Sequence, residues 1–120
     1  MVKMEIPDPG RKLLPLGPAA FYILFALAEG ENHGYAIMKE AETVSSGQFT
    51  MGPGTLYTTI RRLLELGLIE EATTSSDSER RRRCYRLSGS GSEVFEAELN
   101  RMESLVRSAQ RRKLVLRDGH

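Results

Sequence analysis

Apolar residues recur with helical spacing along most of this chain. Four segments show the pattern and are predicted as helices: residues 18–28, 34–44, 53–66 and 90–112. Two short apolar runs on either side of a polar stretch predict strands at residues 68–72 and 84–87. The order of three helices, two strands and a long helix predicts a mainly α (α+β) fold. It is typical of a winged helix-turn-helix with a two-stranded wing and a C-terminal dimerisation helix.

The third predicted helix separates an apolar stripe from a polar face. Leu56, Ile60, Leu63 and Leu64 fall on one side at helical spacing, and Thr and Arg residues occupy the other side. Thr can reach phosphates or base edges, and Arg can bind phosphates or read guanine through two hydrogen bonds. An ordinary amphipathic helix with a solvated face gives the same pattern, so the neighbouring segments have to distinguish the two.

The two predicted strands are joined by a polar segment that ends in four consecutive arginines. Residues 73–79 contain no apolar residue except the methyl groups of threonine, and Arg80–Arg83 follow directly. A charge run alone more often marks a solvated loop, but beside the Thr/Arg helix it favours a hairpin that lies along phosphates. The residues predicted to contact DNA are Thr55, Tyr57, Thr58, Thr59, Arg61, Arg62, Arg80, Arg81, Arg82 and Arg83.

Length and charge are consistent with one small DNA-binding domain. The chain has 120 residues and a formal net charge of +1, so its positive charge is local rather than general. We expect an N-terminal arm (1–15), a winged helix-turn-helix domain (16–88), a C-terminal dimerisation helix (89–113) and a tail (114–120). The longest apolar run is far shorter than the roughly 20 residues that span a bilayer. We therefore expect a soluble, cytoplasmic protein with no membrane partner.

The last predicted helix carries a heptad-like seam. Its apolar residues follow one another at steps of four, three, four and three, which suits docking on a partner helix. The alternative is that this helix packs back on its own domain. Because the first helix is apolar on nearly every face, we expect a homodimer instead. The residues predicted for dimerisation are Phe21, Phe25, Phe95, Leu99, Met102, Val106 and Ala109.

No set of residues with catalytic or metal-binding spacing is visible. The chain has two histidines, His33 and His120, and one cysteine, Cys84. His33 suits a structural position at the start of the second helix better than a metal site. Cys84 follows four arginines, which favour a thiolate, so oxidant sensing stays open beside a plain structural role. Tyr35 and Tyr57 suit phosphate contacts and packing between helices equally. We predict no enzymatic activity, no cofactor and no metal.

Five segments in order resemble PadR-family winged-helix transcriptional regulators of the short type with a single C-terminal helix. They are Phe21–Gly30, His33–Met38, Gly52–Tyr57, Arg62–Ile69 and Tyr85–Ser88. The resemblance implies a homodimer that binds double-stranded DNA, usually as a repressor, on an inverted-repeat operator. It also implies that a small aromatic or hydrophobic effector can enter near the C-terminal helices.

Two departures from the family pattern bear on these expectations. Thr58 stands where many members have proline, which alters the surface that faces the groove. The chain has no tryptophan, whereas some multidrug-sensing relatives stack aromatic ligands between tryptophans. The alternative function is a winged-helix protein–protein interaction module without DNA binding. Such a module would carry apolar or acidic residues on the third helix and no basic wing tip.

Overall fold

The computed structural model describes residues 13–72 and 83–113. In chain order the elements are α2 (Pro18–Ala28), β1 (Asn32–His33), α3 (Gly34–Val44), α4 (Pro53–Glu65), β2 (Ile69–Ala72), β3 (Cys84–Leu87) and α5 (Gly89–Arg111). The four predicted helices and the two predicted strands are confirmed, with ends shifted by one residue in places. Most of the predicted N-terminal arm, the tip of the predicted wing and the predicted tail lie outside the described residues.

The described strands form one antiparallel sheet in the order β1-β3-β2. In the β2–β3 hairpin, Glu70 lies opposite Arg86 and Glu71 opposite Tyr85. The prediction of a two-stranded wing therefore needs one addition, because β1 pairs with the other edge of β3 and places His33 opposite Cys84. A strand of two residues is too short to show a periodic pattern in sequence. It forms here because β3 offers it a hydrogen-bonding edge.

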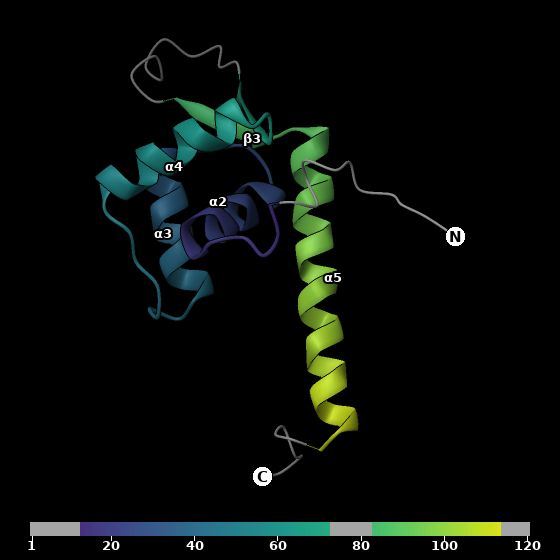
Figure 1. The fold of residues 1–120 in the computed structure, drawn as a ribbon. Coiled ribbons are helices and arrows are strands. Elements are labelled where there is room, and N and C mark those ends of the chain that lie inside the picture. Colours follow the sequence, from purple (N-terminus) through teal and green to yellow (C-terminus); the bar gives the residue numbers. More distant parts are fainter. Residues whose placement is uncertain (1–12, 73–82, 114–120) are drawn as a thin grey trace.

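Helix α2 lies at the centre of the fold and is covered by its own chain. It contacts α3, α4, α5 and β3, and Figure 1 shows it between α3 and α5. Ile23 and Leu24 have no exposed surface. The sequence predicts cover by a second chain from the apolar character of this helix, but four elements of the same chain supply most of that cover.

The turn between α3 and α4 fixes how α4 is presented. The buried Ser45 hydroxyl accepts a hydrogen bond of 2.9 Å from the backbone N–H of Phe49. The Phe49 ring stacks on Tyr22 of α2, with ring centroids 5.0 Å apart. These contacts tie the turn to the core, so α4 begins from a fixed point.

The junction between the sheet and α5 is tied to the end of α4. Gly67 has a φ of 77°, the left-handed conformation that the sequence predicts just past this helix. Ser88 donates a hydrogen bond of 2.6 Å from its hydroxyl to the carbonyl oxygen of Gly67. The same hydroxyl caps α5 by accepting from the backbone N–H of Gly91 at 3.0 Å.

Helix α5 has two unequal halves. Near its start, Phe95 packs with Phe21 and Phe25 of α2 and is only 8% exposed. Further along, Leu99, Leu105 and Val106 are 40%, 57% and 46% exposed, and Figure 1 shows this half extending past the other elements. The alternative of packing on its own domain thus holds for the first half. The prediction that Phe95 contacts a second chain is corrected, because its ring is buried in the core of its own chain.

Within the described ranges, none of the helices combines the length and the hydrophobicity needed to cross a bilayer.

Candidate nucleic-acid interface

Helix α4 presents the polar face that the sequence predicts. Its buried residues are Leu56, Ile60 and Leu63, each at most 2% exposed. The candidate contact residues Thr55, Tyr57, Thr58, Arg61 and Arg62 are exposed, and Thr59 is half-buried. The helix therefore anchors itself by one stripe and leaves the opposite side, with hydroxyl and guanidinium groups, open to solvent.

On one flank, a hollow of about 340 Å³ separates α4 from the sheet. Arg61 lines it from α4, and Arg83 lines it from the residue just before β3. Arg83 donates a hydrogen bond of 2.7 Å to the Glu71 carboxylate. Burial, followed by the Glu71 carboxylate, raises the pKa of Tyr85, which also lines the hollow. Tyr85 therefore stays neutral, and the charge at this flank comes from Arg61 and the Arg83–Glu71 pair.

The position of Tyr57 is compatible with both roles that the sequence leaves open, phosphate contact and packing between helices. Its side chain is 45% exposed on the same flank of α4. Its hydroxyl lies so close to Gly34 that a Cβ at that position would overlap it. Gly34 is thus needed at the start of α3 for the close approach of Tyr57. Tyr35 is different, because it is 60% exposed and has the Lys39 ammonium 5.8 Å from its ring centroid.

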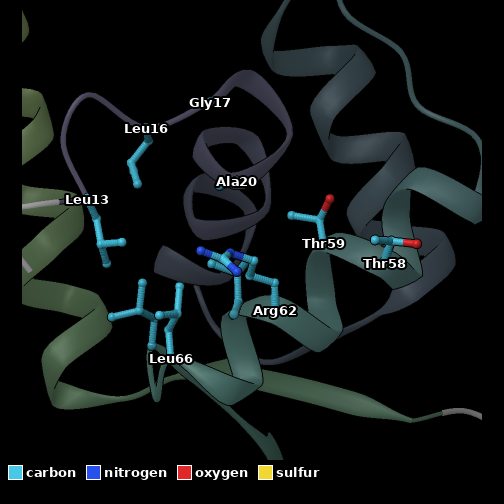
Figure 2. A pocket seen from close by; sticks show the side chains of 10 residues that line it. Leu13, Leu16, Gly17, Ala20, Thr58, Thr59, Arg62 and Leu66 are labelled. Carbon is cyan, nitrogen blue, oxygen red and sulfur yellow. The ribbon is translucent and has the colours of Figure 1, made fainter. Parts of the chain in front are cut away.

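On the other flank, Arg62 reaches over a second hollow (Figure 2). This hollow lies between α4, the start of α2 and the segment that precedes α2. The figure shows Arg62 extending from α4 toward Ala20, whereas Thr58, which also lines this hollow, lies farther from Ala20. Thr59 lies between the two. The predicted groove-facing set is therefore divided, with Thr58 on the open face and Arg62 at its edge.

The arginines of this surface differ in whether an acidic residue neutralises them. Arg83 pairs with Glu71, and Arg86 lies 3.0 Å from Glu70 and 4.0 Å from Glu31. By contrast, neither Arg61 nor Arg62 has a hydrogen bond or an ion pair with the rest of the described chain. Two uncompensated guanidinium groups on one exposed helix form a local positive potential that attracts anions.

Three of the predicted contact residues, Arg80, Arg81 and Arg82, lie outside the described residues. Among the described ones, no group of three or more His, Cys, Asp and Glu side chains is placed to hold a metal ion. His33 is the residue before α3, as expected for a structural position. Cys84 is half-buried in β3.

The elements that carry this surface belong to a known sequence family. Residues 23–97 match the sequence profile of a family described as "Transcriptional regulator PadR-like family". The chain belongs to this family. The match covers α2 through the first part of α5, so it includes α4 and the whole sheet.

Solved structures of PadR proteins share the fold. A PadR family transcription regulator from Clostridium difficile R20291 is 22% identical, with a TM-score of 0.67 over 79% of this chain and 97% of that one. A PadR-like transcription factor from Bacteroides fragilis is 18% identical, with a TM-score of 0.66 over 87% and 98%. Bacillus subtilis PadR, solved in complex with operator DNA, is 24% identical, with a TM-score of 0.61 over 71% and 47%.

Similarity in sequence extends to a protein of Streptomyces fradiae. It is described as an uncharacterized 37.1 kDa protein in transposon TN4556 and is 36% identical over 87 residues. That region covers 72% of this chain and 24% of the other protein. The chain therefore spans about a quarter of the length of this relative.

Proposed function

We propose that this PadR-family regulator is a repressor that binds an inverted-repeat operator as a homodimer. The observation that carries the proposal is the exposed face of α4, where Arg61 and Arg62 have no acidic partner in the described chain. Free guanidinium groups on the second helix of a helix-turn-helix suit contact with phosphates and base edges in the major groove.

The division of α4 into two flanks supports separate proposed roles for its residues. Thr55, Thr58 and Thr59 face the floor of the groove, with Arg62 at one edge to read bases. Arg61 and Tyr57 lie at the other edge, beside Arg83, and contact phosphates. For Arg80, Arg81 and Arg82 we propose contacts with phosphates or with the flanking minor groove. This arrangement would hold α4 in the groove from both sides.

The second half of α5 is the proposed contact between two copies of the chain. Leu99, Leu105 and Val106 are exposed, and Met102 and Ala109 are half-buried on the same side of the helix. Exposed apolar residues at this spacing suit a helix–helix contact. Phe21 and Phe25, which are half-buried on α2, border this surface through Phe95. Pairing along α5 would place two α4 helices about one turn of DNA apart.

The operator complex of Bacillus subtilis PadR supports this proposal through a shared fold. At 24% identity the base preference of that protein is not carried over to this chain. In the proposed complex, Thr58 and its neighbours form the surface that meets the bases.

The proposal is tested by fluorescence anisotropy with DNA from upstream of the protein's own gene and with a scrambled duplex of the same length. We expect tighter binding to the upstream DNA, and a steep loss of affinity for both duplexes as salt rises. Equal affinity for the two duplexes would remove sequence specificity. No binding at low salt would favour a protein-interaction module instead.

A further inference from the structure

The hollow beside Arg62 has the size and lining of a small-ligand site. Its volume is about 270 Å³, close to the lower end of the roughly 300–1,000 Å³ typical of ligand pockets. The side chains that form its walls are mainly aliphatic, and none of the described lining residues is aromatic: Leu13, Leu16, Ala20, Leu63, Leu66 and Leu68. Such walls suit an alkyl chain better than a ring that requires stacking.

The polar groups of this hollow lie together on α4. Arg62 and Thr59 line it with Thr58, and Figure 2 shows the Arg62 side chain extending over the aliphatic part toward Ala20. None of the described lining residues is acidic, and Arg62 has no ion pair with any other described residue. A cation beside an apolar cavity is complementary to a molecule with an apolar tail and an anionic head.

The wall opposite α4 is held in place by α5. The backbone N–H of Leu16 donates a hydrogen bond of 3.0 Å to the Glu98 carboxylate, which has no exposed surface. This bond fixes the segment that carries Leu13, Leu16 and Gly17 against the body of the protein. The cavity is therefore formed before a ligand arrives, which lowers the cost of binding.

We propose that this hollow binds a small aliphatic monocarboxylate, with its chain against the leucines and its carboxylate on Arg62. The carboxylate accepts two hydrogen bonds from the guanidinium group, and the Thr59 hydroxyl donates a third. Because Arg62 is also a proposed DNA contact, the bound acid competes with DNA for this side chain. The site itself does not depend on the proposed function, whereas the competition rests on it.

Direct binding to the full-length protein without DNA tests the site. The probe is octanoate in isothermal titration calorimetry, compared with octanol, which lacks the charge, and acetate, which lacks the chain. Gly17 lines the cavity, and a Cβ there would meet no atom within 4 Å, so Gly17→Leu adds volume without a backbone clash. Arg62→Gln removes the cation. Gly89→Leu is the matched control, since Gly89 is exposed and open but outside the cavity.

We expect octanoate to bind the wild type and Gly89→Leu equally, and to bind Gly17→Leu and Arg62→Gln at least about tenfold more weakly. Octanol and acetate should both bind more weakly than octanoate. Absence of octanoate binding, or equal binding to all four proteins, would overturn the site. Circular dichroism of each variant confirms that it is folded.

A second measurement tests the competition between octanoate and DNA separately from the existence of the site. Octanoate should weaken the binding of upstream DNA to the wild type and leave the affinity of Gly17→Leu unchanged. If octanoate binds but DNA affinity does not fall, competition is overturned. If the protein binds no DNA at all, the proposed function fails, and the calorimetry still decides whether the site exists.

Discussion

The carboxylate of Glu98 and the backbone N–H of Leu16 form a hydrogen bond of 3.0 Å across 82 positions of sequence. Arg101 completes the arrangement with hydrogen bonds of 2.7 and 3.0 Å to the two carboxylate oxygens. Glu98 is buried, yet its charge is compensated by a cation and a backbone donor. The pair connects the segment before α2 to α5, which are the two ends of the described structure.

Replacing this carboxylate should cost stability in a pH-dependent way. The hydrogen bond from Arg101 lowers the pKa of Glu98 despite its burial. A lowered folded pKa adds stability above the unfolded value of about 4.3, and that stability is lost as pH falls through the folded pKa. Glu98→Gln should therefore lower the free energy of unfolding at pH 7 by about 1–3 kcal/mol. The difference from wild type should shrink below about pH 4.

Urea unfolding at one fixed protein concentration, repeated between neutral and acidic pH, measures this effect. Glu103→Gln is the control, because Glu103 also pairs with an arginine, Arg107, but is exposed. An exposed pair contributes at most about 1 kcal/mol. Equal losses for the two variants, or a loss for Glu98→Gln that does not change with pH, would contradict a stabilising role for the buried Glu98 carboxylate.

Gly34→Ala should destabilise the protein through Tyr57. A methyl group at position 34 would overlap the Tyr57 hydroxyl, so the ring has to move. Such overpacking typically costs about 1–3 kcal/mol. In a Tyr57→Ala background the loss should largely disappear, and Gly89→Ala, at an open position, should cause none. A thermal or urea unfolding series of these four variants checks the result, and a loss unaffected by Tyr57→Ala would disprove the contact.

A charge on the exposed seam of α5 should separate two copies of the chain. Val106 is 46% exposed on this seam, and burying a carboxylate there would leave it without a partner. We expect light scattering at tens of micromolar to show a dimer for the wild type and a monomer for Val106→Glu. Asn100→Glu adds the same charge on the opposite side of α5 and should remain a dimer. A monomeric wild type would refute the proposed dimer.

Replacing all of Arg80–Arg83 with alanine should weaken binding to every DNA sequence alike. Each phosphate contact that is lost should flatten the plot of log affinity against log salt by about one unit. The control removes four positive charges from the end of α5, at Arg107, Arg111, Arg112 and Lys113. Anisotropy over a salt series should show little change in slope for the control. Matching slopes for the two variants would mean that net charge, and not the wing, determines binding.

The helices of this fold could be predicted from sequence because each has a local signal. In α4, the spacing of Leu56, Ile60 and Leu63 defines the buried stripe without knowledge of what covers it. The turn at Gly67 follows from the conformational preference of one residue type. The exposed face of α4 follows directly from these two observations.

Other features depend on contacts between distant segments and have no local signal. Strand β1 exists only because β3 lies beside it. Nothing near Leu16 indicates that Glu98 accepts its hydrogen bond. The sequence predicts the apolar seam of α5, but the spacing of its residues does not indicate which partner covers it. In the structure one continuous apolar stripe of α5 packs against α2 of the same chain at Phe95 and is exposed to solvent at Val106.

The most direct test of the central claim compares arginines that differ in their partners. Arg61 and Arg62 have no ion pair in the described chain, whereas Arg86 is held by Glu70 and Glu31. In anisotropy with upstream DNA at moderate salt, Arg61→Ala and Arg62→Ala should each lose about tenfold in affinity or more. Arg62→Ala should also discriminate less against the scrambled duplex, and Arg86→Ala should stay close to wild type. Wild-type affinity in both α4 variants would contradict α4 as the DNA-binding element.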